Sequence, residues 1–251
     1  MVIVSGELRL TILGCDGSYA GPDGACSGYL IRSATTTVWI DCGPGTLANV
    51  QRHIELADLD ALIVSHQHPD HCAELPIIYN AGRYYVGMDP LPVHTTAGVQ
   101  ALTDPQVGLG SAAELFEWVI HSDGDTFEVG DMTITFSLTD HPVETYAMRI
   151  ESGGSSLVYT ADTGPGWHPA ELGSTPDMIL GEGTILAASE NSGIPHLSAR
   201  QLGERAREVG AGRVVLTHVP PSGDPEANQA EATEAFGLQV ELATTGSTFL
   251  I

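Results

Sequence analysis

The chain has 251 residues, of which 42% are hydrophobic, and this length is sufficient to bury the core of one domain. Its formal net charge is −23, from 32 acidic and nine basic residues, which argues against a surface of clustered basic residues that grips nucleic acid. No apolar stretch approaches the roughly 18 residues that a membrane-spanning helix requires. We therefore expect a soluble protein with a single domain, residues 1–251, and no membrane partner.

The amino-terminal segment and the cysteines both bear on the compartment. Met1 to Leu10 contains no basic stretch followed by a long apolar run, so it does not predict a secretory signal. The four cysteines are widely spaced and form no Cys-x-x-Cys pair, which predicts reduced, mostly buried thiols. Together these features predict a cytoplasmic protein.

The first third of the chain predicts short strands separated by turns. Four segments are rich in β-branched or apolar residues and are bounded by turn formers: Leu8–Leu13, Gly28–Arg32, Thr36–Asp41 and Ala61–Ser65. Between the third and fourth segments, Leu47, Val50 and Ile54 are spaced three and four residues apart. This spacing predicts a helix over Leu47–Leu56 that bridges two strands.

The remainder of the chain predicts hairpins and then alternating strands and helices. After a less regular middle, two pairs of segments flank glycine-containing turns: Thr126–Val129 with Met132–Leu138, and Tyr146–Glu151 with Ser156–Ala161. The last third alternates Met178–Gly181, Ser198–Val209, Arg213–Thr217 and Pro225–Phe236, followed by short strands. Ser198 and Gln201 have the spacing of a helix capping box. This order predicts an α/β (α+β) fold of two packed sheets with helices outside.

The clearest chemical signal is the run His66-Gln67-His68-Pro69-Asp70-His71. It follows the apolar segment 62–65 directly, so its potential metal ligands lie at the end of a predicted strand. Imidazole and carboxylate are ligands that zinc prefers, and four of them on one turn can face inward only around an ion. The alternative is a solvated histidine-rich loop.

Further potential ligands also follow predicted strands. His141 comes after the segment 132–138, Asp162 after 156–161, and His218 after 213–217. Each of these residues alone would more often be a capping or surface residue. Taken together they predict a single rim, where loops of a rigid scaffold converge on one pocket.

The order of these elements resembles the metallo-β-lactamase superfamily, whose hallmark is His-x-His-x-Asp-His, over nearly the whole chain. The resemblance also includes Ile40-Asp41-Cys42-Gly43, Ala161-Asp162-Thr163-Gly164 and Leu216-Thr217-His218. It implies a four-layer αββα sandwich with two divalent metal ions, zinc first and manganese or iron as alternatives. It further implies the ligand sets, which are His66, His68 and His141 for one ion, Asp70, His71 and His218 for the other, and Asp162 as the bridge.

Two later motifs resemble the tRNase Z-like phosphodiesterase branch of this superfamily. They are Gly181-Glu182-Gly183-Thr184 and Pro195-His196-Leu197-Ser198-Ala199. In that branch a glutamate of a Glu-Ala-Thr-like motif orients a histidine that precedes a helix, which implies catalytic roles for Glu182 and His196, beside Asp70 of the metal loop. Gly183 replaces the usual alanine, and the alternative reading is a strand-end carboxylate with a helix-start histidine. Asp41 is implied to steady the histidine loop.

The resemblance therefore implies a phosphodiesterase that cleaves a small phosphodiester, such as a cyclic nucleotide, with a hydroxide bridging two metals. The chain has no long basic, glycine-rich arm, and its acidity argues against tRNA 3′ processing or another large nucleic-acid partner. Hydrolysis of a lactone, thioester or β-lactam is the alternative activity, and a non-hydrolytic metal-binding member is a further one. A homodimer is implied by the family alone.

The remaining histidines carry weaker signals. His53, His94 and His121 have no ligand-like neighbours in the sequence and are interpreted as ordinary structural residues. His168 follows Asp162 on a predicted loop, and the turn Gly14–Ser18 has the glycine spacing of a backbone that approaches a pocket. Whether either contacts substrate is left open by the sequence.

Overall fold

Two mixed β-sheets form the centre of the protein. The structure is a computed structural model that describes residues 7–107 and 112–251, so residues 1–6 of the predicted non-secretory segment lie outside the described residues. Within that part of the chain the first seven-stranded sheet has the order β14 (Thr248–Leu250), β1 (Arg9–Gly14), β2 (Gly28–Arg32), β3 (Thr37–Ile40), β4 (Ala61–Ile63), β5 (Leu91–Thr95) and β6 (Phe116–Ile120). The second, also seven-stranded, has the order β13 (Glu241–Leu242), β12 (Arg213–Thr217), β11 (Met178–Glu182), β10 (Ser155–Tyr159), β9 (Tyr146–Ser152), β8 (Met132–Leu138) and β7 (Thr126–Val129).

Each sheet is antiparallel in one half and parallel in the other. In the first sheet β14 to β3 pair antiparallel and β3 to β6 pair parallel. In the second sheet β7 to β10 pair antiparallel and β10 to β13 pair parallel. Neighbouring parallel strands end at the same edge of a sheet, and loops from those ends can meet around one site.

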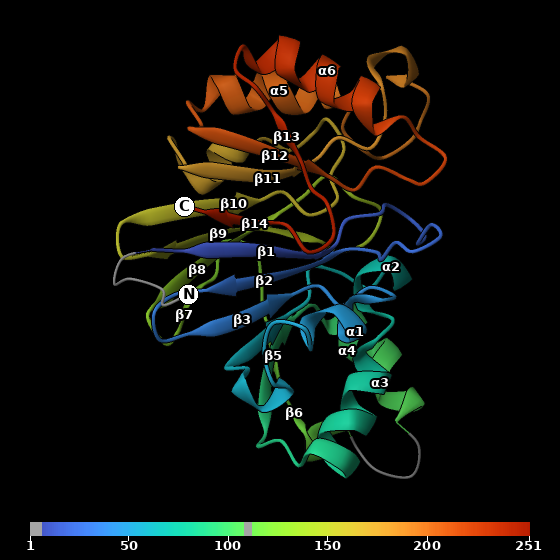
Figure 1. Cartoon of the computed structure of the whole chain (residues 1–251), viewed down its shortest axis with the longest axis vertical. Coiled ribbons are helices and arrows are strands. Elements are labelled where there is room, and N and C mark those ends of the chain that lie inside the picture. The colour runs from blue at the N-terminus through green and yellow to red at the C-terminus, as the bar shows by residue number, and fades with distance from the viewer. Residues whose placement is uncertain (1–6, 108–111) are drawn as a thin grey trace.

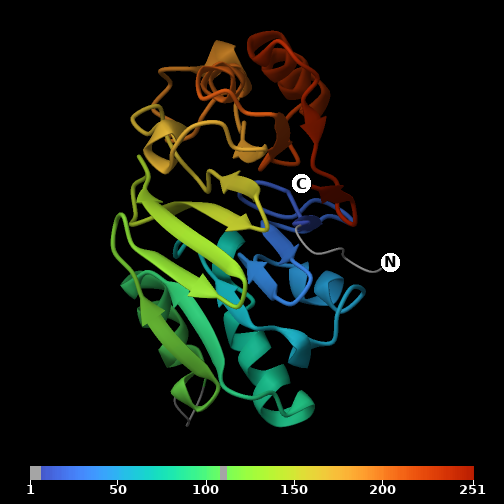
Figure 2. The ribbon, with the colours of Figure 1, turned by 90° about the vertical axis from the view of Figure 1, so that its left-hand side faces the viewer.

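Helices cover the outer face of each sheet, as Figures 1 and 2 show. The first sheet is covered by α1 (Thr46–Val50), α2 (Pro69–Cys72), α3 (Leu75–Asn80), a π-helix (Ala81–Val86) and α4 (Ala97–Thr103). The second sheet is covered by α5 (Ala199–Glu208) and α6 (Pro225–Phe236), drawn in orange and red. Single 3₁₀ turns lie at Leu56–Asp58, Asp104–Gln106, Ala112–Glu114, Pro169–Leu172 and Ala187–Ser189.

Alternation along the strands produces three separate apolar layers. In β1, for example, Leu10 and Ile12 face the second sheet, whereas Leu13 faces the helices. Val214 and Leu216 of β12 pack under α5 and α6, while Val215 joins the central layer. Three apolar layers between four structural layers make the αββα sandwich, and they confirm the predicted fold class.

Most predicted strands and both long helices are present within one or two residues of their expected bounds. Ser198 and Gln201 form the predicted capping box of α5. The predicted helix Leu47–Leu56 is wrong in length, because α1 ends at Val50. The chain continues in turns, in which the amides of His53 and Ile54 both donate to the Val50 carbonyl. The apolar spacing was real, since Leu47 and Ile54 pack against the layer that buries Val50.

The burial of the cysteines agrees with the expectation from the sequence. All four cysteines are free thiols, and Cys26, Cys42 and Cys72 are buried. Among residues 7–107 and 112–251, no helix is both long enough and apolar enough to cross a membrane.

Candidate metal centre

The candidate ligands converge because each follows a strand whose end points to the same rim. The loop after β4 carries His66 and His68 and leads into α2, which begins at Pro69, a favoured residue in a first helical turn. This short helix turns His71 toward the centre of the molecule. His141, Asp162 and His218 follow β8, β10 and β12 of the second sheet. The two sheets therefore contribute opposite walls of one site.

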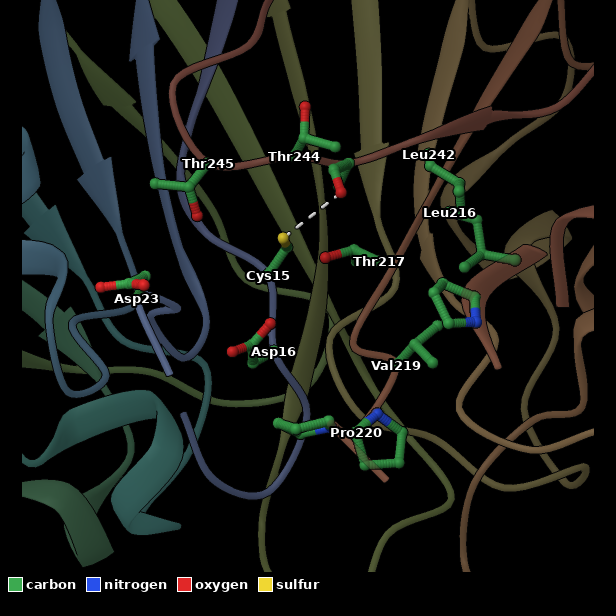
Figure 3. A pocket seen from close by; sticks show the side chains of 13 residues that line it. Cys15, Asp16, Asp23, Leu216, Thr217, Val219, Pro220, Leu242, Thr244 and Thr245 are labelled. Atoms are coloured by element: carbon green, nitrogen blue, oxygen red, sulfur yellow. Dashed lines mark hydrogen bonds between the residues drawn. The ribbon is translucent and has the colours of Figure 1, made fainter. Parts of the chain in front are cut away.

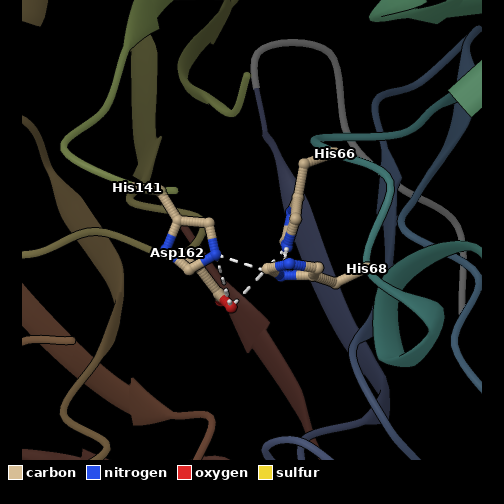
Figure 4. A group of neighbouring side chains, drawn as sticks. All are labelled: His66, His68, His141 and Asp162. Atoms are coloured by element: carbon tan, nitrogen blue, oxygen red, sulfur yellow. Dashed lines mark hydrogen bonds and ion pairs between the residues drawn. The ribbon is translucent and has the colours of Figure 1, made fainter. Parts of the chain in front are cut away.

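His66, His68, His141 and Asp162 form a first cluster, drawn in Figure 4, in which one ligand atom of each lies within 4.8 Å of the others. His68 Nδ1 is 3.1 Å from His66 Nε2 and 3.1 Å from His141 Nε2. Asp162 Oδ2 is 3.7 Å from His66 Nε2 and 3.9 Å from His141 Nε2. Ligands about 2.0–2.1 Å from a tetrahedral ion lie roughly 3.4 Å apart, so this spacing suits a metal.

Asp70, His71, Asp162 and His218 form a second cluster with the same spacing. His218 Nε2 lies 3.3 Å from His71 Nε2 and 3.2 Å from Asp70 Oδ2. Asp162 Oδ1 is 3.3 Å from His71 Nε2 and 3.4 Å from His218 Nε2. Asp162 thus turns one oxygen toward each cluster.

Asp162 Oδ1 also provides a direct test of whether these residues suit a cation. This oxygen is buried and accepts no hydrogen bond from any described residue. A buried carboxylate oxygen without a partner is costly unless something positive satisfies it. The donor set of imidazoles and carboxylates fits a divalent ion at this position.

The charge states of Asp162 and His66 also suit metal binding. Although burial opposes it, the charges of His218 and His71 hold the pKa of Asp162 well below its usual range. Burial lowers the pKa of His66 well below its ordinary value, helped by the charge of His71. At neutral pH these groups are therefore a carboxylate and a neutral imidazole, the forms that coordinate metals.

Asp41 holds the histidine loop from behind, as the sequence resemblance implied. Its Oδ1 accepts a hydrogen bond from the Ser65 amide at 2.7 Å, and its Oδ2 accepts one from the Tyr159 hydroxyl at 2.8 Å. Oδ2 also lies 2.8 Å from His71 Nδ1, which leaves His71 Nε2 to face the cluster. Carboxylates that hold the far nitrogen of a histidine orient the ligand and raise its basicity.

Glu182 and His196 form a pair beside both clusters. His196 Nδ1 lies 3.0 Å from Glu182 Oε1, and the Thr163 amide donates to the same oxygen at 2.7 Å. Burial disfavours a charged His196, but the charge and hydrogen bond of Glu182 outweigh it and raise the pKa of His196 to about 9. The His196 ring is 5.5 Å from the His141 ring and 5.3 Å from the His218 ring, centroid to centroid.

Thr184 links this pair to the second cluster, and the sequence analysis did not assign it a role. Its hydroxyl donates to Glu182 Oε2 and lies 3.0 Å from His218 Nδ1. The signal that could have identified it is its position two residues after Glu182 at the end of β11. A side chain there faces the same direction as Glu182, because strand residues alternate.

The two positions that the sequence left open differ in location. The Ser18 amide donates to Asp70 Oδ2 at 2.8 Å, and a Cβ added to Gly17 would lie 2.4 Å from the His218 carbonyl oxygen, so the turn Gly14–Ser18 lies against the second cluster. His168 instead lies 3.0 Å from Glu208, the last residue of α5, and its Nδ1 accepts from the Ala170 amide. Both ring nitrogens of His168 are engaged away from the clusters.

His94 and His121 form a buried pair that was not predicted from the sequence. His94 Nδ1 lies 2.8 Å from His121 Nε2, and both rings stack against Phe127. The interpretation that neither has a ligand-like neighbour holds only along the chain, because the two histidines lie 27 residues apart, on β5 and after β6. The pairing depends on strand order, which local sequence does not encode.

Two cavities lie near the clusters on different sides. One, of about 210 Å³, is lined by His196 together with Pro165, Ile185, Asn191, Ile194 and Gln201 among others, and it adjoins the Glu182–His196 pair. The other, of about 410 Å³, lies between Cys15 and the segment Leu242–Thr245 and contains none of the clustered ligands (Figure 3). The smaller cavity reaches the candidate site through His196, although none of the ligands of the two clusters lines either cavity.

The αββα sandwich and the histidine and aspartate clusters at its strand ends give this chain the fold and the site of a metallo-hydrolase. Residues 36–219 match the model of the β-lactamase superfamily domain, and the chain belongs to that family. It is 30% identical to "Probable metallo-hydrolase YhfI" of Bacillus subtilis, over 95% of this chain and 98% of that protein. It is also 34% identical to the uncharacterized protein Rv1339 of Mycobacterium tuberculosis, over 97% of this chain and 92% of that protein.

Solved structures agree with this assignment. The crystal structure of YhfI superposes with a TM-score of 0.89 at 29% identity, covering 98% of this chain and 100% of that one. The short form of human tRNase Z superposes with a TM-score of 0.78 at 18% identity, covering 96% of this chain and 98% of that one. The predicted superfamily and its tRNase Z-like relatives are thus confirmed at the level of family and fold.

Proposed function

We propose that this protein is a two-metal phosphodiesterase that hydrolyses small phosphodiesters such as cyclic nucleotides. The observation that carries the proposal is the Glu182–His196 pair, which stands between ligands of both clusters with His196 Nδ1 held at 3.0 Å by Glu182. A phosphodiester has an alkoxide leaving group that must be protonated, and a positioned imidazolium can do this.

In this proposal His66, His68 and His141 hold one divalent ion, Asp70, His71 and His218 hold the other, and Asp162 bridges them. Zinc suits the nitrogen and oxygen ligands best, with manganese or iron as alternatives. Two such ions supply a water activated at neutral pH and positive charge for the phosphoryl oxygens. Asp70 contributes to catalysis by fixing this arrangement together with the Ser18 amide.

His196 acts as the general acid in this proposal. Glu182 holds Nδ1, so Nε2 is the nitrogen that can face a leaving group, and Glu182 keeps the ring protonated. Thr163 and Thr184 hold Glu182 in turn, each by a hydrogen bond to one of its carboxylate oxygens. Neighbouring cations would bring the pKa of His196 down toward neutrality, where a general acid works best.

The charge of the chain supports a small substrate. With nine basic residues against 32 acidic ones, few cations are available to follow a long phosphate backbone. The positive charge for an anionic substrate comes from the bound ions, which dominate locally because distant surface charges are screened within about 8–10 Å. We accordingly expect no large nucleic-acid partner. A homodimer and a cytoplasmic location remain predictions, which sedimentation and cell fractionation address.

The test compares purified variants by metal content and by turnover on bis-p-nitrophenyl phosphate and cyclic mononucleotides, with zinc or manganese added. We expect His196→Ala to keep its metal and to lose about 100-fold or more in turnover of cyclic mononucleotides, whose alkoxide leaving group must be protonated. Its turnover of bis-p-nitrophenyl phosphate should fall much less, because p-nitrophenolate leaves without a proton. His68→Ala and Asp162→Ala should lose metal as well as activity. His168→Ala is the matched control, since that histidine lies on a neighbouring loop but faces Glu208.

Full turnover of cyclic mononucleotides by His196→Ala would contradict the role of His196 as general acid. Turnover on lactones or thioesters alone, with no phosphodiester cleaved, would favour the alternative activity. An absence of bound metal in the wild-type protein would overturn the whole proposal.

A further inference from the structure

Two arginines lie side by side on the outer face of the first sheet. Arg9 begins β1 and Arg32 ends β2, and the register of this antiparallel pair places them directly opposite one another. Arg9 is only 7% exposed. Opposed residues of an antiparallel pair share a face, and like charges placed so close together destabilise a sheet unless something compensates.

Neither arginine has a compensating partner among the described residues. Arg9 Nε, Arg9 Nη2 and Arg32 Nε are buried and find no hydrogen-bond acceptor. No carboxylate within residues 7–107 and 112–251 forms an ion pair with either side chain. Burial and then the charge of Arg9 lower the pKa of Arg32, and no acidic residue appears among the groups that shift it.

The remaining arginines show how unusual this is. The chain has no lysine and nine arginines. Six of them have an acceptor: Arg83, Arg149, Arg200 and Arg213 pair with glutamates, and Arg205 and Arg207 donate to backbone carbonyls. The other three are Arg9, Arg32 and Arg52.

Arg32 also acts on a nearby histidine, His53, which follows α1. After burial, the charges of Arg32 and then Arg52 lower the pKa of His53. In a chain with a net charge of −23, two of the nine basic residues thus lie opposite one another without an ion pair to any described carboxylate. Unpaired buried cations are expensive, and an anion that satisfies their N–H groups removes the cost.

We propose that Arg9 and Arg32 form a binding site for a phosphate group, either free phosphate or a phosphomonoester. The planar guanidinium presents parallel N–H donors that match the oxygens of a tetrahedral oxyanion. The site is distinct from the metal centre, because Arg9 begins the strand whose far end leads into the Gly14–Ser18 turn, roughly 17 Å away along β1. Figure 1 shows β1 running between these two sides of the molecule.

The experiment measures binding of inorganic phosphate and of adenosine 5′-monophosphate by calorimetry, in chloride buffer at constant ionic strength. Wild type is compared with Arg9→Gln, Arg32→Gln, Arg32→Lys and the control Arg83→Gln, which removes an exposed arginine that already has a partner. Phosphate held at the metal centre is common to all five proteins, so only the difference between them reports on this site. We expect affinity to fall about tenfold or more in both glutamine variants and to stay unchanged in the control. Arg32→Lys should also weaken binding, since lysine keeps the charge but lacks the parallel N–H donors of the guanidinium.

Thermal unfolding without phosphate separates a binding role from a packing role. Removal of one of two opposed charges should leave the melting temperature of Arg9→Gln and Arg32→Gln equal to or above that of wild type. Phosphate should then raise the melting temperature of wild type more than theirs. Binding of both ligands assigns the site to phosphomonoesters, and binding of phosphate alone assigns it to the free ion. Equal phosphate binding in wild type and both glutamine variants would overturn the proposal.

Discussion

At the scale of single residues, several side chains of the candidate metal centre each contact two other residues of the site. Asp162 turns one oxygen toward each cluster, and Asp41 holds both the backbone before the histidine loop and the ring of His71. Thr184 serves Glu182 and His218 in the same way. Because each such residue restrains two others, its loss should affect metal binding and the proposed acid together.

Thr184→Val tests this sharing. Valine keeps the shape of the side chain but leaves His218 Nδ1 and Glu182 without their common hydroxyl. We expect zinc affinity to fall about 10- to 100-fold, as loss of outer partners of ligating histidines does. Thr184→Ser retains the hydroxyl and should stay near wild type. Competition with a chromophoric chelator measures the affinity, and an unchanged affinity in the valine variant would contradict the assigned role.

At the scale of elements, the start of α5 positions His196. The helix begins at Ala199, and its cap is closed by Ser198 and Gln201, which exchange hydrogen bonds of 3.0 Å. His196 lies two residues before this cap, so the cap limits how far its backbone can move.

Ser198→Ala should therefore lower the free energy of unfolding by about 1 kcal/mol, the usual cost of losing a capping hydroxyl. Urea unfolding measures this change, with Ser198→Thr as the variant expected to retain most of the stability. We also expect turnover of Ser198→Ala to fall at constant metal content, because the general acid loses its fixed position. A stability loss without any change in turnover would separate the helix cap from the site.

Elements encoded by local pattern were predicted from the sequence, and those encoded by distant contacts were not. The strand before His66 and the capping box at Ser198 are visible in consecutive residues, as are the two glycine turns. Strands β5 and β6 were not predicted. Several residues of β6 are exposed, and this edge strand pairs only with β5. The predicted end of the first helix was wrong for a related reason, since the apolar spacing continues through Ile54 although α1 ends at Val50.

The same distinction applies to the site. His66, His68, Asp70 and His71 are adjacent in sequence, and their proximity needs no knowledge of the fold. His141, Asp162 and His218 were predicted because each follows a predicted strand, the family resemblance assigned them to ligand sets, and the structure brings them to the same place. The pairing of His94 with His121 depends on which strands are neighbours, so no local pattern reveals it.

At the scale of the whole molecule, the two sheets are joined at one edge by aromatic rings as well as by the central core. Phe127 of β7 in the second sheet stacks on His94 and His121 from the first, with ring centroids 4.2 Å and 4.3 Å apart. Burial, and then the charge of His121, lower the pKa of His94 to about 4.

The lowered pKa of His94 predicts that the folded protein loses stability in acid. The unfolded chain takes up a proton on His94 near pH 6.5, whereas the folded protein does so only near pH 4, so stability falls as the pH decreases between these values. At pH 5 the contribution of His94 amounts to about 2 kcal/mol. Urea unfolding of the metal-free protein at pH 7 and pH 5 measures the loss, and His94→Asn, which does not titrate, should lose correspondingly less. Equal losses in both proteins would contradict this role for His94.

Metal removal should destabilise the folded protein as a whole. A ligand that binds only the folded state at 1,000 times its dissociation constant adds about 4 kcal/mol of stability. We expect a chelator to lower the melting temperature of wild type and added zinc to restore it. Asp162→Ala, which lacks the proposed bridge, should show little response to either reagent, and an equal response would contradict the proposed ligand set.

The distribution of the candidate ligands along the chain also affects how the protein matures during synthesis. His66 to His71 emerge early, but His218 lies 147 residues after His71 and follows the next-to-last strand of the second sheet. A nascent chain on the ribosome therefore carries only a partial set of ligands until His218 has been synthesised. Acquisition of the full metal complement would then mark a chain in which both sheets have been synthesised and have folded against each other.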